Sequence, residues 1–189
     1  MNKAVVILIP LVVIAVLVIG AFGIYNGLVS AQEEAKTAWA QVENQYQRRA
    51  DLIPNLVETV KGYAAQEKNI LEEVTRLRSQ WGAARQSGDI NKSLEAAQGL
   101  DGALSRLMVV VERYPDLKSN QNFMKLQDQL EGTENRISVE RRRYNQSVLN
   151  YNRKIRTFPG AFLAGIFGFE RLPLFEAEPG SKQAPKVKF

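Results

Sequence analysis

Histidine and cysteine are both absent from the 189 residues, which removes the residue types on which many catalytic sites depend. Zinc hydrolases, thiol enzymes, Ser-His-Asp triads, haem proteins and iron–sulfur proteins each need one or the other. Helical di-iron carboxylate sites need Glu-x-x-His pairs, which this chain cannot supply. Carboxylate, Ser-Lys or Mg²⁺ chemistry stays open, but no spacing of side chains points to it. The sequence therefore predicts a protein that is not an enzyme and has no metal or cofactor.

Two clusters of ionisable residues interrupt apolar helical faces, and both could hold charge near the core. An unpaired buried charge costs about 3–5 kcal/mol, so such groups must pair with one another or stay in water. We interpret the clusters as a salt-bridge network that fixes helix register, with a ligand site as the alternative. Glu134 and Glu140 are six residues apart and lie on different helix faces, so they make a poor acid–base couple. The members of this predicted network are Arg48, Arg49, Asp51, Glu134, Asn135, Arg136, Glu140 and Arg141.

An uncharged segment near the N-terminus is long enough to cross a membrane. No charged residue falls between Ala4 and Ile24, and Pro10 is tolerated because membrane helices accept proline. At 1.5 Å per residue, this helix would span about 31 Å, close to the ~30 Å hydrocarbon core of a bilayer. A cleaved signal peptide is the alternative, but its apolar core is shorter and it ends in a small-x-small site. The sequence therefore predicts a retained transmembrane anchor over residues 1–24.

The basic residues that flank this anchor indicate its orientation. Lys3 and the terminal amine precede the span, whereas Lys36 is the only basic residue among the twenty that follow it. Because positive flanks favour the cytoplasmic side, the count leans towards a soluble domain on the extracytoplasmic side.

Apolar residues recur every three or four positions over most of the remaining chain, which predicts helices that each bury one face. The first stretch runs from Tyr25 to about Asp51 in continuity with the anchor, and proline is expected to bend or turn the chain at Leu52–Pro54. Three further stretches follow and end near Gln86, Tyr114 and Phe158. Four helices joined by short turns predict an all-α, up-down-up-down four-helix bundle over residues 25–157.

The amino-acid composition changes after the fourth helical stretch. Residues 158–175 form an apolar segment, and residues 176–189 have the composition of a disordered tail. Residues 136–189 carry 11 basic and 4 acidic side chains, so positive charge gathers beside the apolar segment. This combination suits an anionic lipid surface, and packing of the segment on the bundle is an equally weighted alternative. The residues assigned to this membrane or partner contact are Arg153, Lys154, Arg156, Phe158, Phe162, Phe167 and Phe169.

Two further patterns bear on the partners of the chain. Gly23 and Gly27 form a GxxxG pair at the outer end of the span, a spacing that lets two membrane helices approach closely, with local flexibility as the alternative. The three consecutive residues 141–143 are all arginine, so on a helix they point in three directions and form no basic stripe. No nucleic-acid partner is predicted.

Several blocks of residues resemble a known family. Residues 48–57, followed by Val60-Lys61-Gly62-Tyr63, resemble the LemA family. Later blocks resemble its other recurrent segments in the same order, namely Glu134-Asn135-Arg136-Ile137, Tyr144-Asn145, Tyr151-Asn152 and Phe158-Pro159-Gly160. The resemblance implies a bacterial, single-pass membrane protein with a helical bundle, and it brings no established activity. It also implies links to membrane metalloproteases and, in one branch, to magnetosome formation, and it leaves the side of the membrane open.

The anchor, the long helical faces and the missing catalytic residue types together favour a non-enzymatic scaffold in the bacterial inner membrane. Such a protein would self-associate in the lipid bilayer and organise membrane protein partners, including a membrane metalloprotease as the resemblance implies. A lipid-binding or membrane-shaping module that uses the basic, apolar C-terminal segment is the alternative. An enzyme with carboxylate or Mg²⁺ chemistry is the third hypothesis.

Overall fold

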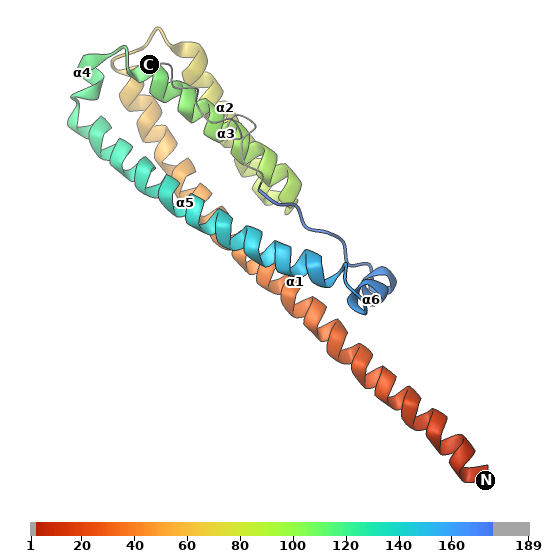
Figure 1. The fold of residues 1–189 in the computed structure, drawn as a ribbon. Helices are drawn as coiled ribbons and strands as arrows, with labels where there is room; N and C mark the ends of the chain where they lie inside the picture. Colours follow the sequence, from red (N-terminus) through yellow and green to blue (C-terminus); the bar gives the residue numbers. More distant parts are fainter. Residues whose placement is uncertain (1–2, 176–189) are drawn as a thin grey trace, which may run out of the picture. The chain divides into compact units, whose positions relative to one another are not determined.

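The computed structural model describes residues 3–175, and the regular structure in this range is entirely α-helical (Figure 1). The long N-terminal apolar helix packs with the following helices in a bundle, which confirms the predicted fold class. The predicted tail, residues 176–189, lies outside the described residues. The helices are α1 (Lys3–Lys61), α2 (Lys68–Gln86), α3 (Ile90–Val111), α4 (Pro115–Lys118), α5 (Gln121–Lys154) and α6 (Gly160–Phe167).

Contacts divide the chain into two compact units, and helices α1 and α5 each contribute to both. Within the described residues, the anchor unit comprises residues 3–39 with Arg143–Leu174, and the bundle unit comprises Ala40–Arg142 with Phe175. Two of the boundaries fall within α1 and α5, where the sequence pattern does not change.

The core of the bundle unit comes from the apolar stripes of four helices. Helices α2 and α3 lie side by side (Figure 1). They are separated by Gly88, whose φ of 68° is a left-handed conformation that glycine adopts easily, and by Asp89. The Asp89 carboxylate accepts hydrogen bonds from the backbone N–H groups of Asn91 and Lys92 and so caps the N-terminus of α3. The buried apolar residues include Val42, Tyr46, Ile53, Leu56, Val60, Val74, Trp81, Leu100, Leu107, Phe123 and Ile137.

The predicted turn at Leu52–Pro54 is wrong, because α1 continues through this proline to Lys61. The chain turns instead over residues 62–67. A proline inside a helix removes one N–H donor, so the carbonyl four residues earlier loses its helical partner. That carbonyl belongs to the buried Ala50, and the Arg78 Nε of α2 donates a hydrogen bond to it at 2.7 Å. Burial of Ile53 and Leu56 on either side of the proline further stabilises the helix.

Substitution of Arg78 with methionine is expected to lower the free energy of unfolding by about 1–3 kcal/mol, because the Ala50 carbonyl then loses its donor. In a Pro54→Ala background the same substitution should cost less, since alanine restores the N–H that a helix normally supplies. Chemical denaturation of all four proteins measures this coupling. Equal costs in the two backgrounds would show that Arg78 does not compensate for the proline.

The fourth predicted stretch also ends earlier than expected. Helix α5 stops at Lys154, and the following segment contains α6, which begins at Gly160. Within the anchor unit, α6 lies beside α1 near the C-terminal end of α5 (Figure 1). The predicted apolar segment is therefore partly helical, and it packs against the first helix of the chain.

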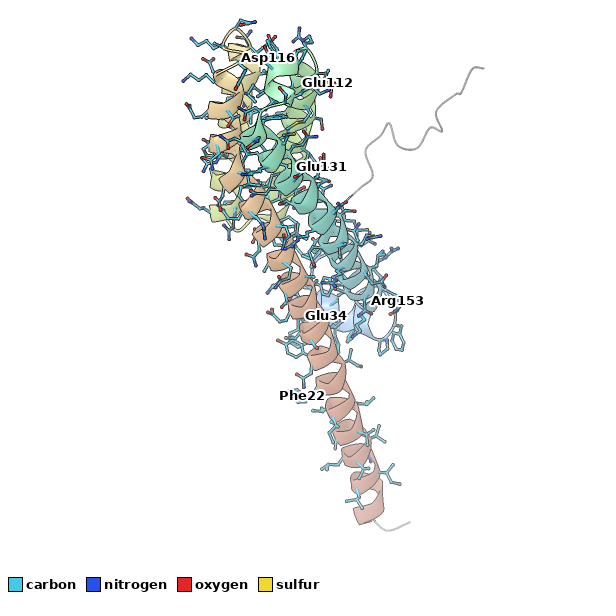
Figure 2. The ribbon with its side chains drawn as sticks, turned by 90° about the vertical axis from the view of Figure 1, so that its left-hand side faces the viewer. Phe22, Glu34, Glu112, Asp116, Glu131 and Arg153 are labelled. Carbon is cyan, nitrogen blue, oxygen red and sulfur yellow. The ribbon has the colours of Figure 1, made fainter. Side chains whose placement is uncertain are left out.

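The first part of α1 has the length and apolar composition needed to cross a membrane, and its most apolar window is not buried in the protein. Ala4, Pro10 and Ile24, which mark the predicted span, all lie within this helix. Figure 2 shows Phe22 projecting from α1, and its side chain is 65% exposed. A continuous apolar surface of this kind is stable in lipid rather than in water, so the protein is membrane-anchored.

Candidate functional site

A group of polar side chains lies in the bundle unit among three helices. We define this polar cluster as Tyr46 and Arg49 of α1, Asp101 of α3, and Glu134 and Arg141 of α5. Arg49 forms ion pairs with both Asp101 and Glu134, and Arg141 forms an ion pair with Asp101. The Tyr46 hydroxyl donates to Asp101 Oδ2 at 3.0 Å and accepts a hydrogen bond from Arg141. Two cations thus face two carboxylates, and Asp101 joins all three helices.

Burial shapes the electrostatics of the polar cluster. The Arg49 side chain is only 5% exposed, and loss of hydration lowers the pKa of its guanidinium, while the charge of Asp101 and its hydrogen bond oppose that shift. The guanidinium carbons of Arg49 and Arg141 lie 5.5 and 5.3 Å from the centroid of the Tyr46 ring, which adds cation–π attraction. These contacts hold both guanidinium groups in fixed positions.

The structure brings together only part of the predicted network. Arg49, Glu134 and Arg141 meet in the polar cluster, and Glu140 is half-buried. The other four members, which are Arg48, Asp51, Asn135 and Arg136, are exposed.

Two members of the polar cluster, Tyr46 and Asp101, were not among the predicted network residues. The signal for Asp101 was a single carboxylate among the apolar residues that follow Leu100 on a buried helix face. A buried carboxylate needs a cation, and the two arginines on α1 and α5 are the partners the structure supplies.

A groove of about 580 Å³ in the bundle unit borders the polar cluster. The ion pair between Glu112 and Lys118, at 2.6 Å, and the exposed Glu131 lie along it. Polar and charged side chains of both signs make up most of the lining, and the apolar lining residues are buried except for the half-buried Met108. A mixed surface of this kind suits the side of an amphipathic helix. Among residues 3–175, no group of three or more acidic side chains is placed to hold a metal ion. The apolar lining consists of Leu104, Met108, Val111, Phe123 and Leu130.

In the anchor unit, hydrogen bonds from α5 hold the chain that follows α6. The hydroxyls of Tyr144 and Tyr151 donate to the carbonyls of Pro173 and Glu170, each at 2.8 Å. Burial raises the pKa of both hydroxyls, and the charge of Glu170 adds to the shift at Tyr151, so both tyrosines stay protonated donors. The Asn152 amide bonds both the N–H and the carbonyl of Leu172.

The predicted contact residues at the C-terminal end take different positions. Phe167 and Phe169 pack on Tyr25, with ring centroids 4.8 and 5.8 Å away. Phe158 and Phe162 are exposed. The three basic residues, Arg153, Lys154 and Arg156, are exposed as well, and Figure 2 shows Arg153 on α5.

The two glycines of the GxxxG pair lie on an open face of α1. A Cβ atom built on Gly23 or Gly27 would meet nothing within 4 Å, so neither glycine serves close packing inside the described part of the chain. The Gly27 carbonyl accepts a hydrogen bond from Lys154 Nζ at 3.3 Å.

The blocks that carry the family resemblance lie in both units, mostly on α1 and α5. The model for the LemA family matches residues 38–189, most of the chain. The chain belongs to the LemA family.

Individual relatives fall into two groups by their names. The chain is 32% identical over 178 residues to magnetosome protein MamQ 2 of Paramagnetospirillum magneticum, and 31% identical to magnetosome protein MamQ of Magnetospirillum gryphiswaldense. Each alignment covers 82% of this chain and 65% of the relative, so the LemA-family chain spans less than two thirds of these proteins. Protein LemA of Metamycoplasma hominis is 25% identical over 169 residues, which cover 86% of this chain and 75% of that relative.

Proposed function

We propose that this LemA-family protein is a non-enzymatic, single-pass membrane scaffold that self-associates and organises other membrane proteins. Its setting would be the bacterial inner membrane, with the helical domain on the extracytoplasmic side. A membrane metalloprotease is one partner of the kind we propose. The similarity to proteins named magnetosome proteins supports a role tied to membrane organisation.

The groove beside the polar cluster is the observation that carries this proposal. Its lining carries acidic and basic side chains together with the apolar residues Met108 and Leu130, so it offers a surface for a helix with both charged and apolar side chains. The polar cluster beneath it satisfies its own charges through internal pairs, which suits a structural role better than acid–base catalysis. The open face at Gly23 and Gly27 supports close approach of a second membrane helix.

Substitution of Ser105 with tryptophan tests the groove. Ser105 is exposed and lines the groove. The one hydrogen bond described for its hydroxyl goes to the Asp101 carbonyl of the same helix. An indole at this position should fill the groove and lower the yield of oligomer and partner adducts on the order of tenfold, equivalent to about 1.4 kcal/mol of binding free energy. Crosslinking of the full-length protein in native membranes, followed by mass spectrometry, measures the adducts.

Gln98→Trp is the matched control, because Gln98 is exposed on the same helix and does not line the groove. It should leave the adducts unchanged. A wild-type protein that stays monomeric and forms no adducts would contradict the scaffold proposal, and equal adducts in Ser105→Trp and wild type would contradict the role of the groove.

A further inference from the structure

Helix α6 is apolar on two faces. Leu163 and Ala164 are buried in a cluster with Leu28 of α1 and Tyr151 of α5. On the other side, Phe162 and Ile166 are 68% and 60% exposed, and Phe158 just before the helix is 89% exposed. Large apolar side chains that are exposed on α6 and just before it are energetically unfavourable in water. We therefore expect another apolar surface to cover them.

The exposed face of α6 lies beside the end of the membrane span within the anchor unit. Ala21 and Ile24, in the last turn of the predicted span, pack against the same buried cluster as Leu163. The neighbouring Phe22 projects from α1 and is 65% exposed (Figure 2). The exposed apolar surface of α6 therefore adjoins the surface of α1 that faces lipid.

A crevice of about 280 Å³ separates α1 from α6 in this region. Its walls are apolar and aromatic, with Tyr25 as the only member that carries a polar side-chain group. A narrow apolar space at the boundary of a bilayer is suited to an unbranched hydrocarbon chain. The lining residues are Val18, Ala21, Phe22, Tyr25, Leu163, Ile166 and Phe167.

Positive charge lies where lipid headgroups would be. Arg153, Lys154 and Arg156 are exposed at the end of α5, and Lys154 Nζ reaches the Gly27 carbonyl of α1, just beyond the span. Near an anionic membrane surface each basic side chain contributes about 1 kcal/mol of attraction.

We propose that α6 is an interfacial helix that binds phospholipid of the bilayer in which α1 is anchored. Phe158, Phe162 and Ile166 insert at the boundary between headgroups and acyl chains, and one acyl chain occupies the crevice between α1 and α6. The basic residues at the end of α5 contact anionic headgroups. This lipid site goes beyond the scaffold role and uses a different unit of the protein.

The absence of cysteine from the chain permits a direct test in the full-length protein. Phe162→Cys and Ile166→Cys are labelled with an environment-sensitive fluorophore and reconstituted in vesicles of phosphatidylethanolamine and phosphatidylglycerol. Nitroxide lipids with shallow spin labels should quench both positions strongly, as they should at Phe22→Cys, which faces lipid. Glu34→Cys, exposed further along α1, is the matched control and should be quenched weakly (Figure 2).

Weak quenching at both α6 positions, equal to that at Glu34→Cys, would overturn the proposal. Blue-shifted emission without lipid quenching would also overturn it, since a protein surface and not lipid would then cover α6. Neither result depends on adducts formed through the groove of the bundle unit, so the two proposals fail separately.

Lipid charge tests the headgroup contact. Replacing phosphatidylglycerol with phosphatidylcholine, or replacing Arg153 and Arg156 with glutamine, should each reduce shallow quenching at Phe162→Cys. Quenching that responds to neither change would overturn the assignment of the basic residues to anionic headgroups.

Discussion

Substitution of Asp101 with alanine is expected to lower the free energy of unfolding by about 3–5 kcal/mol, because it leaves two buried or half-buried arginines without their shared carboxylate. Of the partners described within the polar cluster, Arg49 would keep Glu134 and the Tyr46 ring, and Arg141 would keep Tyr46. Two neighbouring cations would then repel each other in a poorly hydrated site. Thermal or chemical unfolding of the full-length protein, followed by circular dichroism, measures the loss.

The double variant Asp101→Ala, Arg141→Met separates the loss of pairing from the loss of packing. Removal of the second cation should recover part of the stability, so the two costs should not add. Asp128→Asn, an exposed carboxylate on α5, is the control and should change stability by less than about 0.5 kcal/mol. Additive costs, or an Asp101→Ala protein as stable as the control, would show that Asp101 does not hold the helices together.

A Gly160→Ala substitution should displace α6 from its packed position in the anchor unit. A Cβ atom at this buried position would collide with the backbone carbonyl oxygen of Lys154, and it would lie 3.7 Å from the Leu28 side chain. A backbone atom cannot move aside as a flexible side chain can, so the cost should reach the upper part of the ~1–3 kcal/mol range for overpacked sites. Hydrogen exchange in α6 should accelerate more than exchange in α3, which a local measurement by mass spectrometry detects.

Gly165→Ala is the matched control within the same helix. Nothing lies within 4 Å of a Cβ built there, and alanine in a helix interior is favoured over glycine by about 0.5–1 kcal/mol. Exchange in α6 should therefore slow or stay unchanged. If hydrogen exchange in α6 is the same in both variants, the close approach between Gly160 and the end of α5 does not hold α6 in position.

The two variants act on separate units and so separate the two proposed roles. Asp101→Ala loosens the bundle unit, which carries the groove, whereas Gly160→Ala loosens the anchor unit, which carries the lipid site. Adduct formation should fall mainly in the first variant and lipid quenching mainly in the second.

The helical faces were predictable because burial follows a period that the sequence displays directly. Most residues that recur at this spacing are buried, among them Ala35, Trp39, Ile137 and Tyr144. The turn at Gly88 and the N-cap at Asp89 are equally local, since a left-handed glycine and a capping carboxylate act within a few residues of their own position.

The turn predicted at Pro54 was wrong because the interaction that decides the structure there comes from a distant part of the sequence. The local rule, that proline disfavours helix, is correct about the cost. It takes no account of Arg78, which lies 28 residues from Ala50 in the sequence and donates to the carbonyl that the proline leaves without a donor. A distant donor can offset a local penalty, and only the packed structure shows whether one is present.

By itself, the sequence determined the membrane anchor, the helical class, the buried stripes and the family, because these follow from composition, short-range periodicity and local blocks of residues. Tertiary structure alone decided that α1 continues past Pro54, that Asp101 joins Arg49 and Arg141, and that α6 rests against the end of the span. Each of these depends on side chains from helices far apart in the chain, and no local pattern records which distant groups meet.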